Sequence, residues 1–578
     1  MWARHRLEWV TAVVAAVLGV VYLLLPPMGS DLAAQVARAE FFAAHGYTPM
    51  DLRWYAGVNQ LGYSLVSQPV MALLGVRVTG VLSLVGAAVL FAVLLRATAA
   101  PRPWLGALVG VACIAGNLVS GRVTYGLGVF FGLAALVLVM RRRRSWLAVV
   151  PALLAGATSP VAGLFLGLAG VALAAAGLLG THGRARTGGP RRTDEADGQT
   201  KTGGPRQPDE TDGQTKTGGP RQPDETDGQT KTGGPRQPDE TDGRDRIRQG
   251  LLVAVPAAIP LAVLSLFFGD GGWMNISRTD TVRAVVASLA VALLVPRRPV
   301  RVAGVLSAAG VLAAALVHTP VGLNATRLAV MFTLPVLAAY AAPPLLRNRT
   351  AWWVTAGLLV VACWWQPPVV TGDLRDIGNP TAERGYFTPL LDRLARERLT
   401  GRVEIPSTRD YWEAAHMADV PLARGWLRQA DIERNPLFFT EIPGTSGTGV
   451  PLTADTYRAW LDELAVQFVA VPDAELTWSG RPEAALIAGG LPYLTRVWSD
   501  EHWQLYAVTA PHPIVAAPAT LASQTATTVS FDAPAAGEVP VRVRFSRRLT
   551  ASHGAEVVRD GDWTRVRVPA AGRYTLTS

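Results

Sequence analysis

One predicted helix near the amino terminus carries side chains that could perform acid-base or anion-binding chemistry. The polar segment from Gly29 to Pro69 directly follows the first apolar stretch. If Ser30 is the N-cap of a helix that runs to about His45, a rotation of about 100° per residue brings four polar side chains onto one face. These are Asp31, Gln35, Arg38 and His45, whereas Glu40 points away from them. A carboxylate can remove a hydroxyl proton, and a guanidinium can bind a phosphate through two hydrogen bonds.

The sequence leaves a second interpretation of this face open, because a polar helix face can also be the solvated side of a helix that lies on a bilayer. Ionisable groups beside a membrane are costly to desolvate and often mark functional sites, which makes Asp31 the first candidate for chemistry. The next polar group is interpreted as substrate-binding, although its aromatic rings could instead anchor the chain at the membrane interface. It comprises Asp51, Arg53, Trp54 and Tyr55.

Two arginines stand at the mouths of apolar stretches. Arg327 lies in GLNATRLAVMFTLP, and Arg122 precedes another apolar run. A guanidinium at the membrane boundary could hold a phosphate bidentately. The alternative for both is a side chain that extends towards lipid headgroups.

The composition indicates an integral membrane protein. The hydrophobic content is 49% and the mean hydropathy is +0.24. The length of 578 residues is enough for more than one domain. The net charge of +10 comes from arginine clusters between apolar runs. The sequence has no basic face interleaved with aromatic residues, so it does not indicate nucleic-acid binding. Cys113 and Cys363 lie inside apolar runs, so neither a disulfide framework nor a metal site is predicted.

The length of the apolar runs predicts about eleven membrane-spanning helices. A hydrocarbon core of about 30 Å requires about 20 helical residues. The predicted spans lie near residues 8–26, 70–95, 103–120, 123–140, 145–158, 160–180, 249–268, 282–296, 301–317, 326–343 and 350–365. The arginine clusters fall at every second connection, which predicts a plasma-membrane protein with a cytoplasmic amino terminus. The loop 29–69 and everything after residue 367 are then extracytoplasmic.

The remaining segments divide the chain into five parts. Residues 1–180 and 249–366 hold the spans. Between them, the unit TKTGGPRQPDETDGQ recurs with a period of 15, and its lack of apolar residues predicts a disordered cytoplasmic loop over residues 181–248. Residues 367–510 have helix and strand patterns that predict an extracytoplasmic α/β domain, and the alternating runs of residues 511–578 predict a β-sandwich.

The order of these parts resembles the glycosyltransferase C superfamily of multi-spanning membrane enzymes. The resemblance is carried by one helix, a long external loop with an acidic residue close behind it, an aromatic and glycine-containing run, many further spans and an external carboxy-terminal domain. The acidic motif is Gly29, Ser30 and Asp31, and the run is Trp54, Tyr55, Gly57, Gly62, Tyr63, Ser64, Leu65 and Pro69. The chain is similar in particular to the bacterial 6-pyruvoyl-tetrahydropterin-synthase-related and YfhO-like membrane protein groups.

The resemblance implies an inverting transfer of a sugar from a polyprenyl-phosphate donor to a cell-envelope glycan on the external face. Asp31 would be the general base, and Arg327 or Arg38 would neutralise the leaving phosphate. Asp31 and Arg327 should then face one cavity. Many members carry an adjacent acidic pair, whereas Leu32 follows Asp31 here.

Two functions from other classes remain open. A transporter or flippase of envelope lipids would place ionisable residues midway along its spans and repeat its span pattern, whereas the predicted spans have nearly uncharged centres. A non-catalytic envelope scaffold would bind glycan or protein through its external domain, and Asp31 would be dispensable to it.

Overall fold

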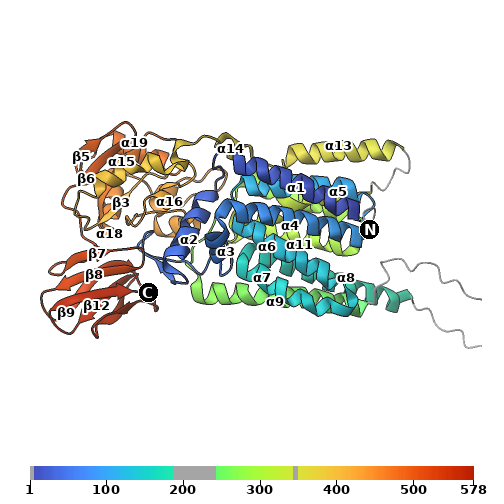
Figure 1. Ribbon diagram of the computed structural model, residues 1–578, viewed down its shortest axis with the longest axis horizontal. Coiled ribbons are helices and arrows are strands. Elements are labelled where there is room, and N and C mark those ends of the chain that lie inside the picture. Colours follow the sequence, from blue (N-terminus) through green and yellow to red (C-terminus); the bar gives the residue numbers. More distant parts are fainter. Residues whose placement is uncertain (1–4, 188–242, 343–348) are drawn as a thin grey trace, which may run out of the picture.

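The computed structural model describes residues 5–187, 243–342 and 349–578. The predicted disordered loop with its 15-residue repeats therefore lies largely outside the described residues. The described part consists of a bundle of long helices with an α/β domain and a β-sandwich side by side at one end of it (Figure 1).

A helix occupies each of the eleven predicted spans, so the helical character of these segments is confirmed. Among the described residues, six helices are long and apolar enough to cross a membrane, judged by length and composition. The number of eleven transmembrane spans stays a prediction. The helices are α1 (Arg6–Leu24), α4 (Val76–Ala97), α5 (Pro103–Val119), α6 (Val123–Val139), α7 (Val149–Thr158), α8 (Pro160–Thr187), α9 (Gly243–Phe268), α10 (Arg278–Leu294), α11 (Arg298–Leu316), α12 (Arg327–Tyr340) and α13 (Arg349–Trp365).

Helices α8 and α9 are longer than the sequence predicts. Residues 181–187 and 243–248, expected in the loop, continue the two helices. Glycines explain how they pair closely: a Cβ atom added at Gly170 would lie 2.6 Å from the carbonyl oxygen of Gly250. Such small residues allow two helix backbones to approach each other along their length.

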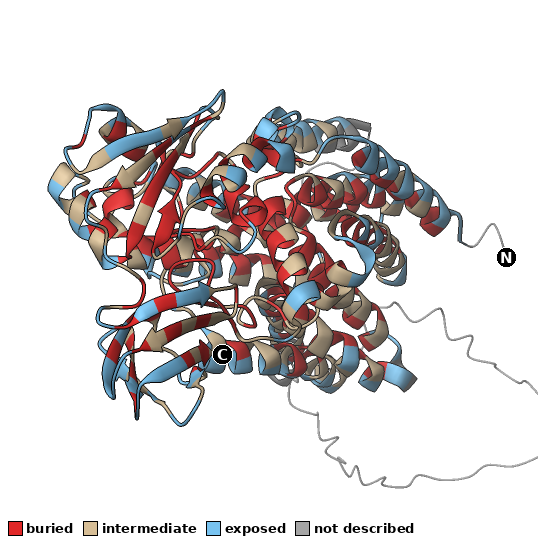
Figure 2. Cartoon of the chain, turned by 60° about the vertical axis from the view of Figure 1, so that its left-hand side comes forward, coloured by how far each residue is buried: buried red, intermediate tan, exposed pale blue. Residues whose placement is uncertain are grey.

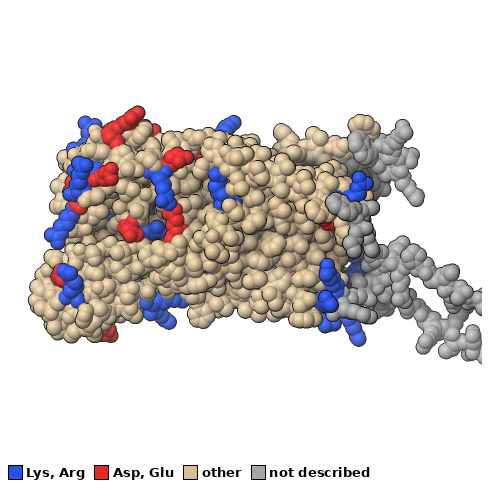
Figure 3. Space-filling view, in the orientation of Figure 1, with Lys and Arg blue, Asp and Glu red and all other residues tan. Residues whose placement is uncertain are grey.

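The ends of the bundle differ in what they carry. The polar loop 29–69, which contains α2 (Leu32–His45) and α3 (Ser67–Leu74), lies at the same end as both carboxy-terminal domains, and the amino terminus lies at the other end (Figure 1). In this view the flank of the bundle is almost free of charged side chains, which gather at its two ends (Figure 3). This distribution fits a helical membrane domain. Which end faces the cytoplasm stays a prediction.

The α/β domain is built on a four-stranded mixed sheet. Its order is β3-β4-β6-β5, in which β3 and β4 are parallel and the other neighbours are antiparallel. The strands are β3 (Arg402–Glu404), β4 (Val466–Pro472), β5 (Leu494–Ser499) and β6 (Trp503–Val508). The predicted helix followed by a buried strand is confirmed, because α18 (Ala454–Glu463) begins with a capping box at Thr453 and leads into β4.

The last part of the chain is the predicted β-sandwich. One antiparallel sheet has the order β10-β13-β8-β7 and the other β11-β12-β9. The alternating runs of the sequence form four of these strands, whereas the short β7, β10 and β11 were not predicted. The strands are β7 (Thr520–Gln524), β8 (Thr528–Ala533), β9 (Gly537–Arg544), β10 (Thr550–Ala551), β11 (Glu556–Asp560), β12 (Trp563–Val568) and β13 (Gly572–Thr577).

The α/β domain packs directly against the loop 29–69. The Leu422 amide donates to the carbonyl oxygen of Arg53 at 2.7 Å, and the Tyr55 hydroxyl donates to the carbonyl oxygen of Gly425. Buried residues occupy the centre of the molecule, where the helices meet the two carboxy-terminal domains (Figure 2). The loop is therefore enclosed between two domains and does not lie on a free membrane surface.

Candidate functional site

The structure brings Asp31 into contact with two arginines that are distant in sequence. The Nη2 atom of Arg327, at the start of α12, donates to Oδ2 of Asp31 at 3.0 Å. The Nε atom of Arg122, just before α6, lies 3.4 Å from the same oxygen. The Asp31 side chain is 13% exposed, and those of Arg122 and Arg327 are 20% and 17% exposed. Two cations thus share one carboxylate oxygen in a largely enclosed place.

Two tight glycine turns hold these side chains together. Gly29 and Gly121 have φ values of +108° and +71°, in the region that favours glycine. A Cβ atom at Gly29 would lie 2.3 Å from the carbonyl oxygen of Val119, and one at Gly121 would lie 2.5 Å from the Leu32 amide nitrogen. The two turns are therefore in direct backbone contact, which the Asp31 amide reinforces by donating to the carbonyl oxygen of Ser120 at 3.1 Å.

The helix of the predicted active face begins one residue later than expected. Asp31, and not Ser30, occupies the N-cap position of α2, yet its side chain makes no capping hydrogen bond. An N-cap carboxylate usually accepts from the first turn of its helix. Here the two guanidiniums pair with its Oδ2 atom instead, so the Asp31 side chain is directed towards the membrane helices.

Gln35 and Arg38 point from α2 into the protein interior. Gln35 donates to the Tyr63 hydroxyl at 2.8 Å and accepts from the Thr124 hydroxyl at 2.6 Å. Arg38 donates to Gln60 at 3.0 Å, and its guanidinium lies 4.1 Å from the centroid of the Tyr63 ring. Burial lowers the pKa of Arg38. Its buried Nε and Nη2 atoms have no hydrogen-bond partner within the described residues.

His45 lies at the far end of α2 from Asp31. At 1.5 Å per residue, the helix separates the two by about 20 Å. The His45 ring packs against Phe41, with 5.0 Å between centroids. The structure therefore does not bring His45 to the Asp31 site, although both were predicted on one face.

The second predicted group is occupied by internal contacts. Asp51 is fully buried and accepts from Arg53 at 2.7 Å and from Gln60 at 2.7 Å. Trp54 and Tyr55 are 1% exposed, so they do not form an interfacial belt. Their substrate-binding role stays a prediction, and these contacts favour a structural one, in which the group joins the loop to the α/β domain.

Three residues near the site were missed because they belong to the external region. Asp373, on α14 (Thr371–Arg375), accepts from the Ser30 amide at 3.2 Å and from the Ser120 hydroxyl. The Trp426 indole donates to the carbonyl oxygen of Ser30 at 3.3 Å. Arg428 interacts electrostatically with Asp31. No pattern in the sequence signals these neighbours, because they reach the site only through the docking of a later domain.

An apolar cavity of about 230 Å³ lies inside the bundle beside the site. It is enclosed by α4, α6, α8, α10, α11 and α12, and its lining includes Tyr125, Leu328 and Phe332. Tyr125 also lines a small polar cavity with Arg122 and Arg327. The Arg327 guanidinium lies 5.6 Å from the centroid of the Tyr125 ring. The Tyr125 side chain therefore lines both the apolar cavity and the cavity of the two arginines.

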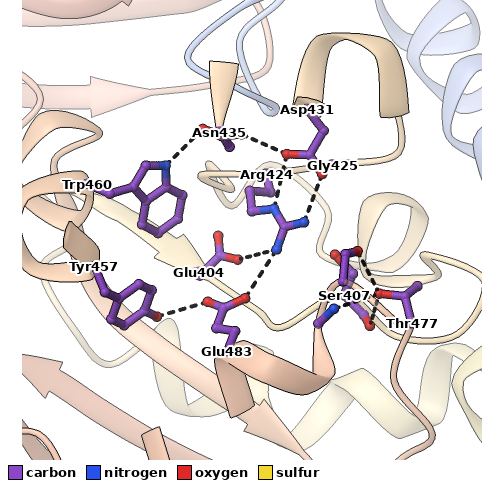
Figure 4. A network of polar contacts seen from close by, with 12 residues as sticks. Glu404, Ser407, Arg424, Gly425, Asp431, Asn435, Tyr457, Trp460, Thr477 and Glu483 are labelled. Atoms are coloured by element: carbon purple, nitrogen blue, oxygen red, sulfur yellow. Dashed lines mark hydrogen bonds and ion pairs between the residues drawn. The ribbon is translucent and has the colours of Figure 1, made fainter. Parts of the chain in front are cut away.

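A buried charge network anchors the segment that carries Trp426 and Arg428. Arg424 donates to Asp431 at 2.8 Å and to Glu483 at 3.2 Å, and its Nη1 atom lies 3.7 Å from Glu404 (Figure 4). These side chains are at most 2% exposed. Burial raises the pKa of Glu483 to about 7 and that of Glu404 well above its ordinary value. A single cation thus fixes both ends of the segment between residues 424 and 431.

Within the described ranges, no group of three or more His, Cys, Asp or Glu side chains has a geometry that could hold a metal ion.

Comparisons with known proteins return distant structural likenesses. No family model matches the chain, and no curated protein matches it. Similar solved structures include the cryo-EM structure of the arabinofuranosyltransferase AftD from mycobacteria, at 16% identity and a TM-score of 0.43, covering 88% of this chain and 40% of that one. A mutant of AftD is 13% identical with a TM-score of 0.41, covering 99% of this chain and 60% of that one. The chain thus spans about 40 to 60% of the length of these structures.

Proposed function

We propose that this protein is a membrane glycosyltransferase that uses a polyprenyl-phosphate sugar as donor and a cell-envelope glycan as acceptor. The observation that carries the proposal is the contact of Asp31 with Arg122 and Arg327 beside an apolar cavity. The assignment to the glycosyltransferase C superfamily, with its narrower likeness to the YfhO-like and 6-pyruvoyl-tetrahydropterin-synthase-related groups, belongs to this proposal.

The arginine pair suits the donor phosphate. Both guanidiniums bind the same oxygen of one carboxylate, so the cations outnumber the anion that they contact directly. A phosphate that entered between them would form charge-assisted hydrogen bonds with both. It would also displace the Asp31 carboxylate, which would then be unpaired and more basic, since a nearby cation favours the charged form of an acid.

The apolar cavity suits the lipid part of the donor. At about 230 Å³ it is smaller than the sites of whole drug-sized ligands, which are about 300–1,000 Å³, so it would hold only the first part of a long chain. Its position beside Tyr125 would place that part directly next to the phosphate. The rest of the chain would stay in the bilayer.

These groups can carry out the transfer of the sugar from the donor to the acceptor. An acceptor hydroxyl oxygen attacks the anomeric carbon from the side opposite the phosphate, and the carbon–oxygen bond to the phosphate breaks. The hydroxyl proton passes to Asp31, and the electron pair of the broken bond stays on the phosphate oxygen. Arg122 and Arg327 stabilise the charge that grows there. The configuration at the anomeric carbon is inverted.

The arginine distribution supports an external location for this site at the plasma membrane. With the amino terminus in the cytoplasm, the loop 29–69 and both carboxy-terminal domains face the envelope glycans. The membrane would supply the lipid-linked sugar, and the α/β domain and β-sandwich would meet the acceptor.

The test replaces the wild-type gene by Asp31→Asn and compares lipid-linked and envelope glycans. We expect the variant to accumulate donor and lose product as the deletion does, while the protein level stays normal. Glu40→Gln is the matched control, because Glu40 lies on the same helix but pairs with Arg384 on the exposed side. Glycans that are unchanged in both the deletion and Asp31→Asn would refute the enzyme and favour a scaffold.

A further inference from the structure

We propose that Asp373 is a positioning residue that holds Asp31 against Arg122, an inference that rests on the proposed function of that pair. Its two carboxylate oxygens bind one group on each side of the site. Oδ1 accepts from the Ser30 amide at 3.2 Å, and Oδ2 accepts from the Ser120 hydroxyl. Ser30 directly precedes Asp31, and Ser120 lies two residues before Arg122. One side chain thus links the two turns that carry the acid and the cation.

The surroundings of Asp373 show that its inward orientation is imposed by the fold. Asp373 and Asp376 are 5% and 2% exposed, whereas Val370, Leu374 and Ile377 are 40–43% exposed. A short segment in water would present the opposite pattern, with acids outside and aliphatic side chains inside. The pattern is explained if the aliphatic side faces the bilayer, since α14 follows the predicted last span directly. Asp373 is then held at the membrane surface with its carboxylate directed at the site.

The segment is also attached to the α/β domain. Arg409 donates to the carbonyl oxygen of Gly372 at 3.1 Å and pairs with Glu475 at 2.7 Å. A shift of either the last span or the external domain would therefore move Asp373. Through Ser30 and Ser120, that movement would change the distance between Asp31 and Arg122.

Hydrogen exchange of the full-length protein in nanodiscs tests the contact without any ligand. In Asp373→Ala the Ser30 amide loses its acceptor, so we expect the peptide that contains Ser30 and Asp31 to exchange at least about 10-fold faster. Asp376→Ala is the matched control, because Asp376 is buried on the same segment but accepts from Asn379 at 2.8 Å. Exchange that is unchanged in Asp373→Ala, or equally faster in both variants, would overturn the proposal.

Binding of a polyprenyl phosphate distinguishes positioning from a general structural role. Asp373 also fixes, through Ser120, the turn that carries Arg122, so its loss should misplace this phosphate-binding cation. We expect Asp373→Ala to weaken binding by about 10-fold, Asp373→Glu to restore part of it, and Asp376→Ala to bind as the wild type does. Ser120→Ala should add nothing in an Asp373→Ala background, because both remove the same hydrogen bond. If the wild type binds no polyprenyl phosphate but exchange near Ser30 still depends on Asp373, the lipid chemistry fails and the coupling between the two turns stands. If binding depends on Arg327 but not on Asp373, only the positioning role fails.

Discussion

Arg327 and Asp31 are 296 positions apart in sequence, and a hydrogen bond of 3.0 Å joins their side chains. They come from opposite halves of the helical bundle, one from the start of α12 and the other from the residue before α2. Charged side chains at the end of a membrane domain are costly to desolvate, and for this reason they often mark functional sites. The predictions below follow from this contact and from its surroundings.

Loss of either arginine should weaken the binding of a polyprenyl phosphate. Because a hydrogen bond to a charged group contributes about 1.5–3 kcal/mol, we expect Arg327→Gln and Arg122→Gln each to reduce affinity about 10- to 100-fold. Binding to the protein in nanodiscs can be measured by thermophoresis. Arg283→Gln, at an exposed position of α10, is the control and should bind normally. Equal losses in all three variants would point to a general effect of surface charge.

Filling the apolar cavity should block the lipid without disturbing the charged site. Ala169 of α8 lines the cavity, and Ala169→Phe would occupy much of its volume of about 230 Å³. We expect binding of a polyprenyl phosphate to fall at least about 10-fold, while binding of a short water-soluble phosphate ester stays the same. Val171→Phe, whose parent side chain is 50% exposed on the same helix, should change neither. Normal lipid binding in Ala169→Phe would show that the chain lies elsewhere.

Gly121→Ala should destabilise the protein far more than Gly46→Ala. Both glycines have positive φ, so an alanine costs about 1–2 kcal/mol at either position. At Gly46 a Cβ atom meets nothing within 4 Å, whereas at Gly121 it would lie 2.5 Å from a backbone nitrogen. The added overpacking brings the expected cost at Gly121 to about 2–5 kcal/mol. Thermal unfolding in detergent measures the difference, and similar melting temperatures would contradict the close contact.

The α/β domain should lose stability as the pH rises from about 4.3 to about 7. Burial raises the pKa of both Glu413 and Glu483 to about 7, from an ordinary value of about 4.3. In that window the folded protein holds protons that the unfolded chain has released, so unfolding becomes easier as the pH increases. Each such group contributes up to about 1.4 kcal/mol per pH unit. Glu413→Gln keeps a neutral side chain at every pH and should flatten part of this slope in thermal unfolding between pH 5 and 7.5. An unchanged slope would contradict the raised pKa of Glu413.

The sequence predicts most of the fold because its signals are local. Apolar runs of span length, the capping residue Thr453 and the alternating strands after Pro511 each depend on neighbouring residues. The fold class of a helical membrane domain with a carboxy-terminal α/β and β-sandwich region is confirmed on this basis, whereas its external location stays a prediction. The helix α8 is longer than the sequence predicts, because its polar end lacks the apolar residues that mark a span.

The site was predictable only in part. Asp31 and Arg327 were expected to face one cavity. Their side chains are in contact, and Arg327 lines the small cavity beside Tyr125. Helical spacing placed Arg38 on the same face as Asp31, but it could not show that Arg38 is buried over Tyr63. Helical spacing also could not predict that Asp373 and Arg428 lie near Asp31, since their position depends on how the α/β domain docks. Long-range docking leaves no periodic signal in the residues that it brings together.

The backbone contact between Gly29 and Gly121 has a consequence for how a lipid could reach the arginines. The turn before α2 and the turn before α6 cannot separate without breaking the contact and the hydrogen bond from Asp31 to Ser120. The two turns therefore form a fixed edge of the helical bundle beside the arginines. A long-chain lipid that arrives sideways from the bilayer would therefore have to pass between other helices, and α10, α11 and α12 line the same cavity.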